Sequence, residues 1–192
     1  MRILVVGAGA TGGYFGGRLA RAGRDVTFLV RAGRAQLLER RGLRITGLDE
    51  ETVLRPRVIR AGDIDAPYDV VLLAVKATGL DRAVDDMAAA VGPHSLVVPV
   101  LKGVRHVDVL AARFGDQAVL GGVSKVATTL DAQGDIVRPC RTCATELAAT
   151  PPRRGWTRCT ACSAVPGSRQ ACPATSTRRC VPSGFSSPLS AR

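Results

Sequence analysis

The first 138 residues predict an α/β fold with a doubly wound, mostly parallel sheet, and three observations support that prediction. Short apolar runs of strand length alternate with segments in which apolar residues recur at helical spacing. A glycine turn, residues 7–12, separates the first apolar run from the first helical segment. Near Arg138 the composition changes abruptly. We therefore expect one α/β domain over residues 1–138, followed by an Arg/Pro/Cys-rich tail, residues 139–192, that is disordered or aberrant and forms no recognisable domain.

The N-terminal segment has the pattern of one βαβ unit. Arg2–Val6 is rich in valine, isoleucine and leucine, as expected of a strand buried on both faces. Phe15 and Leu19 lie at helical spacing, and Gly23 suits the left-handed residue that ends a helix. A second apolar run covers residues 25–30. Strand, glycine turn, helix and strand in this order indicate a Rossmann-type fold.

The later segments repeat the alternation of strands and helices. Strands are predicted at residues 43–46, 68–75, 96–101, 119–130 and 135–137, and helices at residues 35–41, 80–91 and 104–114. In open α/β sheets the ligand lies beyond the carboxyl ends of the strands. Lys76 and Lys102 each close one of these strands, so both are expected near the site of any chemistry.

The glycine turn has the spacing G-x-G-x-x-G directly after a strand and before a helix. In that motif the first glycine permits a tight turn, the second lets the backbone approach a pyrophosphate, and the third lets the helix pack on the strand. The helix N-terminus offers unpaired N–H groups to the phosphates. A glycine-rich turn without a ligand is the alternative, which the flanking elements disfavour. The predicted cofactor-binding residues here are Gly7, Ala8, Gly9, Ala10, Thr11 and Gly12.

The residue that follows the second strand indicates which dinucleotide is bound. NAD-binding domains usually carry Asp or Glu about twenty residues beyond the glycines, where it accepts hydrogen bonds from the ribose 2′-OH. Here the sequence has Val30 and Arg31, with Arg34 three residues on. A guanidinium can bind a 2′-phosphate through two hydrogen bonds, whereas a carboxylate would repel it. The pattern favours NADP(H), and the alternative is that both arginines are solvated surface residues.

Several ordered motifs resemble those of the ketopantoate reductase (2-dehydropantoate 2-reductase) family. They are GAGATGGYFGGRLA at 7–20, DVTFLVR at 25–31, LAVKA at 73–77 with Leu80 and Asp81 after it, VPVLKGV at 98–104, and GGV at 121–123. The resemblance covers about residues 1–138. It implies NADPH-dependent reduction of 2-dehydropantoate, a small 2-keto acid, to (R)-pantoate, a step toward pantothenate and coenzyme A.

The resemblance also assigns roles by position. The glycine turn would hold the pyrophosphate, Arg31 the 2′-phosphate, and Lys76 would lie beside the nicotinamide and the substrate. Lys102 and Ala127 are also assigned to the cofactor site. Lys102 stands where the family has an asparagine, a change that keeps hydrogen-bond donors but removes the amide acceptor and adds charge. No catalytic residue is assigned, and Lys76 and Lys102 are the nearest candidates.

The tail departs from the family. The resemblance implies a second, helical domain that supplies a proton-donating lysine and a carboxylate for the substrate, yet no lysine follows Lys125. The tail has the composition of a GC-rich gene translated out of frame. The sequence therefore predicts a frameshifted or truncated reductase, and the alternative is a catalytically inactive NADP-binding fragment.

The distribution of charge bears on the class of partner. The net charge of +11 is typical of nucleic-acid binders, but residues 1–138 carry 19 Lys and Arg against 15 Asp and Glu, whereas the tail carries 8 Arg against one acid. The excess is thus not a folded basic face, which argues against nucleic acid as a partner. No apolar run is long enough for a membrane helix, and no secretory signal is recognised. We expect a cytoplasmic protein, and the sequence leaves its oligomeric state open.

All six cysteines lie in the tail. Cys140 and Cys143 form one C-x-x-C pair and Cys159 and Cys162 another, and the 15 residues between them fit a four-cysteine zinc site. Such a module, rich in arginine, would bind nucleic acid. The flanks lack the hairpin pattern of a zinc ribbon, and chance pairing is easy where cysteines crowd together. We therefore predict no metal, with these four cysteines as the alternative ligands.

Overall fold

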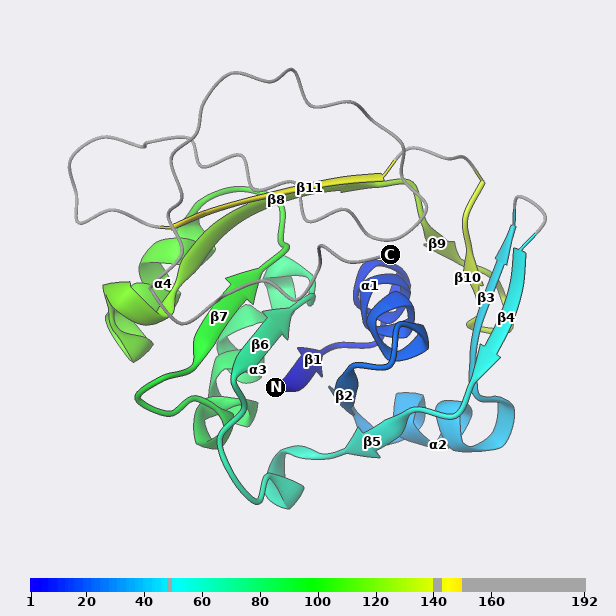
Figure 1. Cartoon of the computed structure of the whole chain (residues 1–192), viewed down its shortest axis with the longest axis horizontal. Coiled ribbons are helices and arrows are strands. Elements are labelled where there is room, and N and C mark those ends of the chain that lie inside the picture. Colours follow the sequence, from blue (N-terminus) through cyan, green and yellow to red (C-terminus); the bar gives the residue numbers. More distant parts are fainter. Residues whose placement is uncertain (48–49, 140–142, 150–192) are drawn as a thin grey trace.

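A central sheet of five parallel strands organises the molecule in the computed structural model, which describes residues 1–47, 50–139 and 143–149 (Figure 1). The strands are β1 (Arg2–Val6), β2 (Asp25–Leu29), β5 (Arg57–Ile59), β6 (Val70–Leu73) and β7 (Leu96–Pro99), and their order is β5-β2-β1-β6-β7. The chain builds outward from β1 in one direction, then returns and builds in the other. Ile3 accordingly pairs with Val26 on one side and with Val70 on the other. The predicted doubly wound parallel sheet is confirmed.

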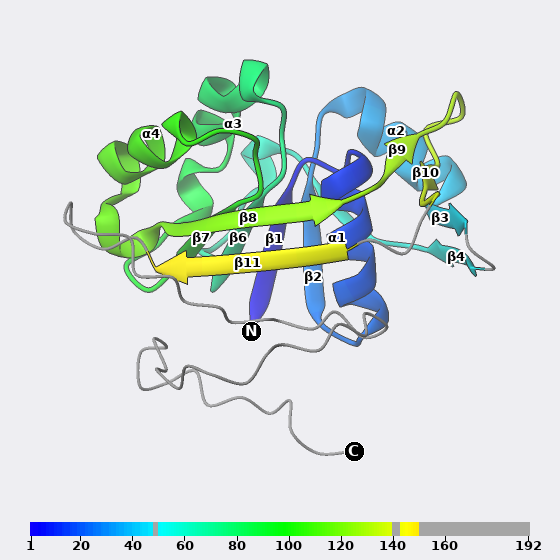
Figure 2. The ribbon, with the colours of Figure 1, turned by 90° about the horizontal axis from the view of Figure 1, so that it is seen from above.

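Helices cover both faces of this sheet. They are α1 (Ala10–Arg21), α2 (Ala32–Arg41), α3 (Leu80–Asp86) and α4 (Arg105–Phe114), with short 3₁₀ turns η1 (Ala61–Asp63), η2 (Ala77–Gly79), η3 (Ala88–Ala90) and η4 (Asp116–Ala118). Helix α1 lies on one face, and α3 and α4 lie on the other (Figure 2). Among the described helices, none has the length and apolar character that a bilayer crossing requires.

Strand β1 is buried on both faces because its side chains alternate between two cores. Ile3 and Val5 belong to the core that contains Tyr14 of α1. Leu4 and Val6 belong to the core that contains Leu80, at the start of α3, and residues of α4. These four side chains, Ile3 to Val6, are at most 3% exposed. This arrangement explains why Arg2–Val6 has no polar alternation.

Glycines let α1 lie close to the strands beneath it. A Cβ atom on Gly16 would stand 2.5 Å from the Phe28 ring, and one on Gly17 would stand 2.7 Å from Ile45 Cδ1. Neither distance is compatible with an ordinary van der Waals contact. The glycines of this helix, which have low helix propensity, are therefore explained by packing.

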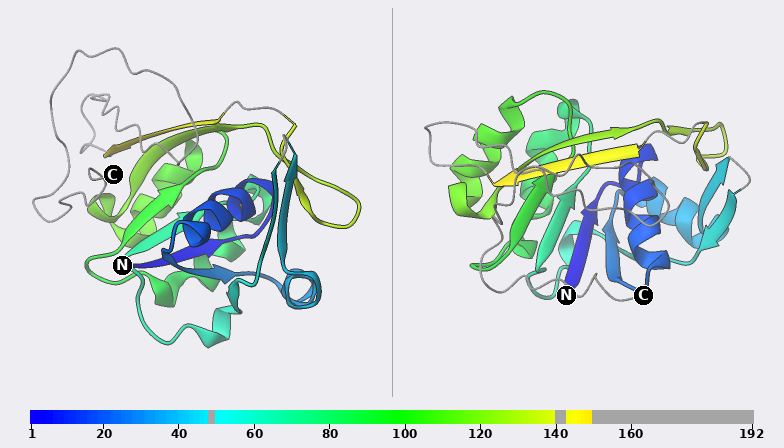
Figure 3. Two further views of the ribbon diagram at one scale, coloured as in Figure 1. Left: turned by 45° about the vertical axis from the view of Figure 1, so that its right-hand side comes forward. Right: turned by 45° about the horizontal axis from the view of Figure 1, so that its top comes forward.

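A second, four-stranded sheet lies beside α1 (Figure 3). It contains β3 (Leu43–Gly47), β4 (Glu50–Leu54), β9 (Thr129–Leu130) and β10 (Ile136–Val137) in the order β4-β3-β10-β9. Ile136 is fully buried and pairs with Ile45 across the parallel β3–β10 contact. The predicted strand at 43–46 therefore exists, but it belongs to this sheet rather than to the central one. Because β10 pairs with β3, residues some ninety positions later in the chain lie again near α1 and α2.

A two-stranded antiparallel ladder is formed by β8 (Leu120–Val126) and β11 (Cys143–Ala149). An isolated bridge between Val97 and Val119 connects the start of β8 with β7. Strand β11 lies within the tail, residues 139–192, and its backbone pairs with β8 over residues 143–149. A β-ladder is made by backbone N–H and C=O groups, so a segment poor in branched aliphatic side chains can still form one. Residues 140–142 and 150–192 lie outside the described part of the chain.

Element boundaries differ from the sequence prediction in ways that affect the site. Helix α2 begins at Ala32, three residues before the predicted start, which places Arg34 in its first turn. Strand β6 ends at Leu73, so Lys76 caps η2 rather than closing a strand. The predicted helix at 80–91 is divided into α3 and η3 at Met87, whose ψ of −1° departs from the helical value.

Candidate dinucleotide-binding site

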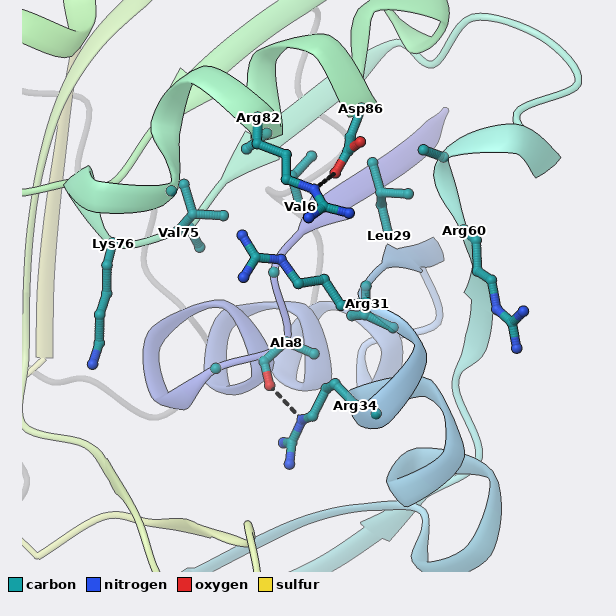
Figure 4. Close-up of a pocket in the computed structure, with 18 of the residues that line it drawn as sticks. Val6, Ala8, Leu29, Arg31, Arg34, Arg60, Val75, Lys76, Arg82 and Asp86 are labelled. Carbon is teal, nitrogen blue, oxygen red and sulfur yellow. Dashed lines mark hydrogen bonds and ion pairs between the residues drawn. The ribbon is translucent and has the colours of Figure 1, made fainter.

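A cavity of about 870 Å³ opens at the carboxyl ends of β1, β2, β5 and β6 (Figure 4). Its walls come from the segments that follow these strands and from α3, including residues 7–9, 29–34, 60–62, 74–76 and 82–83. The strand order reverses between β1 and β6, so the cavity lies at the switch point of the sheet. Open α/β sheets bind their ligands in this position, and the volume is in the range of small-molecule and cofactor sites.

The three motif glycines occupy three different environments. Gly7 has a φ of +93°, which favours glycine, and its N–H donates to the Leu29 carbonyl at 3.0 Å. A Cβ on Gly12 would collide with the Gly7 carbonyl oxygen and would stand 2.8 Å from Ala74 Cβ. No atom lies within 4 Å of the Cβ position of Gly9, so the backbone there is open to a ligand. Tight turn, open backbone and close helix packing are the geometry that a pyrophosphate-binding turn requires.

Helix α1 presents its N-terminus at this turn. The helix begins at Ala10, and its N-cap residue, Gly9, makes no side-chain capping hydrogen bond. Its first intrahelical bond runs from the Gly13 N–H to the Gly9 carbonyl at 2.8 Å. The N–H groups of the preceding residues therefore have no partner within the helix, and the positive end of the helix dipole adds to them. A phosphate group is the natural ligand of such a helix end.

Basic side chains dominate the cavity wall. The wall contains Arg31, Arg34, Arg60, Lys76 and Arg82, against a single acid, Asp86. Arg82 Nε lies 3.7 Å from Asp86 Oδ2, which neutralises part of the charge on that side (Figure 4). The remaining excess of positive charge suits a ligand with several phosphates.

Arg31 is the N-cap residue of α2 and its side chain extends across the cavity (Figure 4). Its guanidinium reaches the start of α3, since a Cβ on Gly79 would lie 3.4 Å from Arg31 Nη2. The residue is exposed, and it makes no ion pair with any residue the structure describes. Its guanidinium is therefore available to an anion that enters the cavity.

Arg34 differs from Arg31 because its guanidinium makes hydrogen bonds to backbone carbonyls of the protein. Arg34 Nε donates to the Ala8 carbonyl at 2.8 Å, and Nη1 donates to the Gly134 carbonyl at 2.7 Å. Burial lowers the pKa of Arg34, while the charge of Asp135 acts in the opposite direction. Arg31, the predicted ligand of the 2′-phosphate, thus differs from Arg34, whose guanidinium already bonds to two backbone carbonyls.

The structure gathers only some of the predicted cofactor residues at the cavity. Gly7, Ala8, Gly9, Arg31 and Lys76 line it. Ala10, Thr11 and Gly12 belong to the first turn of α1 and do not line it.

Two further predicted residues also lie outside the described cavity wall. Lys102 is exposed in a bend after β7, next to Gly103 with a φ of +91°. Ala127 is half-buried directly after β8. Lys76 is exposed at the rim of the cavity (Figure 4), so of the two lysines considered as candidate catalytic groups only Lys76 lines this site.

Two cationic residues of the cavity were missed in the sequence. Arg60 directly follows β5, a three-residue strand too short to be recognised from its pattern. Arg82 lies in α3, where the sequence analysis considered only the buried apolar face. The detectable signal for Arg60 was its place after a β-branched pair, Val58 and Ile59.

Three of the four cysteines named as alternative zinc ligands lie beyond the part of the chain that the structure describes. Cys140, Cys159 and Cys162 lie outside the described residues, and Cys143 is placed only as the first residue of β11. Within the described ranges, no group of three or more His, Cys, Asp and Glu side chains is arranged to hold a metal.

A Rossmann-type sheet with a glycine turn at its switch point defines a dinucleotide-binding domain. The sequence profile of the family described as ketopantoate reductase PanE/ApbA matches residues 3–142, and this chain belongs to that family. The motifs predicted this family and predicted NADP(H) as the cofactor. Both predictions agree with this membership.

Individual relatives support the same assignment. An uncharacterized oxidoreductase of Bacillus subtilis, YkpB, is 42% identical over 136 residues, which are 71% of this chain and 45% of that protein. A 2-dehydropantoate 2-reductase of Mesorhizobium japonicum is 33% identical over 155 residues, 70% of this chain and 48% of that protein. The chain therefore spans about half the length of these relatives.

Solved structures show the same fold. The 2-dehydropantoate 2-reductase of Geobacter metallireducens superposes with a TM-score of 0.72 at 27% identity, over 81% of this chain and 51% of that one. D-mandelate dehydrogenase, solved with NADH and anilino(oxo)acetate, superposes with a TM-score of 0.73 at 21% identity, over 80% and 50% of the two chains. The second likeness concerns the fold alone.

Proposed function

We propose that this chain is the NADP(H)-binding half of a 2-dehydropantoate 2-reductase. The observation that carries the proposal is the position of Arg31 at the carboxyl end of β2, with its guanidinium extended into the cavity. NAD-binding domains place a carboxylate there for the ribose 2′-OH, whereas a guanidinium is complementary to a 2′-phosphate. Membership of the ketopantoate reductase family supports the same cofactor.

Different residues of the cavity would bind different parts of the dinucleotide. The open backbone at Gly9 and the N-terminus of α1 would bind the pyrophosphate, and Arg31 would bind the 2′-phosphate. Arg60 and Arg82 line the same cavity and would add to its attraction for the phosphates. Lys76, at the end of the β6 segment, would lie toward the nicotinamide and the 2-keto acid.

The reaction of the complete enzyme is then hydride transfer to the keto group of 2-dehydropantoate. NADPH supplies the hydride when it is bound. The protein must stabilise the negative charge that develops on the substrate oxygen and must supply a proton to it. Lys76 places a positive charge on the cavity rim, and we assign it this electrostatic role without making it the proton donor.

A binding experiment tests the cofactor assignment. The full chain is titrated with NADP⁺ and with NAD⁺ in a calorimeter at the same ionic strength. We expect tighter binding of NADP⁺, by about 1.5–3 kcal/mol, the usual contribution of a hydrogen bond to a charged group. Equal dissociation constants would contradict the assignment of Arg31. Failure to bind either dinucleotide would contradict the proposed function as a whole.

A further inference from the structure

We propose that Arg34 is a positioning residue for the phosphate site: it holds the Ala8–Gly9 peptide so that the Gly9 N–H faces the pyrophosphate, and it connects the glycine turn to the β9–β10 hairpin. The inference rests on the proposed function for the identity of the ligand. It assigns a role to Arg34, which the sequence analysis did not place among the cofactor-binding residues.

Arg34 fixes the orientation of one peptide group in the glycine turn. Arg34 Nε donates to the Ala8 carbonyl oxygen at 2.8 Å (Figure 4). In a planar trans peptide the carbonyl and the following N–H point in opposite directions. With the Ala8 carbonyl directed at Arg34, the Gly9 N–H is directed away from Arg34. The backbone at Gly9 is open, because a Cβ there would meet no atom within 4 Å. The same hydrogen bond occupies a carbonyl oxygen that would otherwise repel a phosphate.

The other end of the Arg34 guanidinium contacts the turn between β9 and β10. Arg34 Nη1 donates to the Gly134 carbonyl at 2.7 Å. Gly134 has a φ of +80°, and a Cβ there would lie 2.6 Å from Leu37 Cδ2 and 2.9 Å from Arg34 Nη1. The positive φ favours glycine, and a Cβ would crowd the ends of the Leu37 and Arg34 side chains, so glycine suits the turn that presents this carbonyl to Arg34.

The hairpin turn is itself held firmly. Asp131 Oδ1 accepts hydrogen bonds from the N–H groups of Gln133 and Asp135 at 2.9 and 2.8 Å. The Asp135 carboxylate, whose side chain is 13% exposed, pairs with Arg41 Nη2 at 2.7 Å and with Arg44 Nε at 3.4 Å. The Gly134 carbonyl is therefore a fixed acceptor. Because Arg34 bonds to both carbonyls, the Gly134 turn restrains the glycine turn at Ala8, more than one hundred residues earlier in the sequence.

Three probes separate a positioning role from a direct contact. NADP⁺ carries both the pyrophosphate and the 2′-phosphate, NAD⁺ carries only the pyrophosphate, and adenosine 2′-phosphate carries only the 2′-phosphate. In the full chain, Arg34→Met should weaken NADP⁺ and NAD⁺ by the same factor, about tenfold, the equivalent of one charged hydrogen bond. The affinity for adenosine 2′-phosphate should stay within twofold. The exposed Arg40 of the same helix gives the matched control, Arg40→Met, which should leave all three affinities unchanged.

The opposite pattern would overturn the inference. A loss confined to NADP⁺ and adenosine 2′-phosphate, with NAD⁺ unaffected, would make Arg34 a direct ligand of the 2′-phosphate. Unchanged affinities for all three probes would remove any role for Arg34 in the site. Arg34→Lys keeps the charge but can reach only one of the two carbonyls, so its losses should fall between those of wild type and Arg34→Met.

A measurement without ligand keeps the inference testable even if no dinucleotide binds. The N–H groups of Gly9 and Asp135 belong to the two peptide groups whose carbonyls Arg34 contacts. In the amide NMR spectrum of the free chain, Arg34→Met and Arg34→Lys should shift both signals, and Arg34→Met should lower the Gly9 order parameter. Arg40→Met should do neither. An unchanged Gly9 order parameter in Arg34→Met would refute the positioning role independently of the cofactor assignment.

Discussion

Position 12 requires the smallest residue because α1 crosses directly over the glycine turn. We predict that Gly12→Ala destabilises the protein by about 1–3 kcal/mol, since its Cβ would meet the Gly7 carbonyl oxygen and Ala74 Cβ, and neither can move without displacing a strand end. Chemical denaturation of the full chain measures this. Gly33→Ala is the matched control, because nothing lies within 4 Å of its Cβ position in α2. If both substitutions had the same effect, close packing would not be the reason for Gly12.

Charge at position 31 should determine the choice of dinucleotide. We predict that Arg31→Asp reverses the preference for NADP⁺ over NAD⁺, because a carboxylate repels a 2′-phosphate and accepts hydrogen bonds from a ribose 2′-OH. Dissociation constants for both dinucleotides are the measurement. Arg40→Asp changes the charge equally on an exposed part of the same helix and should leave the ratio unaltered. A ratio that moves equally in both variants would indicate a general effect of net charge.

At the scale of elements, α4 carries a buried titratable group in its first turn. Burial lowers the pKa of His106 below its ordinary value of 6.5. In the pH range below 6.5 the unfolded chain therefore binds more protons at this site than the folded chain does. The free energy of unfolding should rise with pH in that range, with a slope of at most about 1.4 kcal/mol per pH unit, and should level off above it.

Variants of the two histidines test this pH dependence. Urea unfolding is measured between pH 5 and 8 for wild type, His106→Gln and His94→Gln. We expect the His106 variant to lose much of the slope, because it removes the group with the lowered pKa. Substitution of the exposed His94 is the matched control. Parallel curves for wild type and the His106 variant would contradict the prediction.

Sequence patterns predicted the elements with long or uniform signals and missed the short ones. β1 and β2 were recognised because strands buried on both faces are continuous apolar runs. β5, with three residues, was missed, and Arg60 was missed with it. The partners of Arg34 could not be predicted either, because Gly134 reaches it only through the parallel pairing of β3 and β10. Local periodicity contains no information about such contacts.

At the scale of the whole molecule, the chain spans about half the length of the reductases it matches. We predict that the 192-residue chain shows no detectable NADPH oxidation with 2-dehydropantoate. General acid catalysis typically contributes about 10²–10⁴-fold, and orientation of the reactants contributes more. The chain's lysines are Lys76, Lys102 and Lys125, and of these only Lys76 lines the described cavity.

The comparison for this assay is the full-length Mesorhizobium japonicum 2-dehydropantoate 2-reductase at saturating substrate. Turnover within tenfold of that enzyme would mean that the other half is dispensable. Lys102→Asn, which restores the family residue, would then show whether Lys102 had taken over the proton transfer. Turnover that persisted in this variant would exclude Lys102 from that role.

The central claim is that the cavity at the switch point of the sheet binds NADP(H), and residue-resolved NMR tests it most directly. The amide spectrum of the ¹⁵N-labelled full chain is recorded during titration with NADP⁺. We predict saturable shifts centred on Gly7, Gly9, Ala10 and Arg31, while the signals of the β3–β4 edge and of α4 stay in place. Shifts centred on any other surface, or a spectrum unchanged at millimolar NADP⁺, would contradict the account.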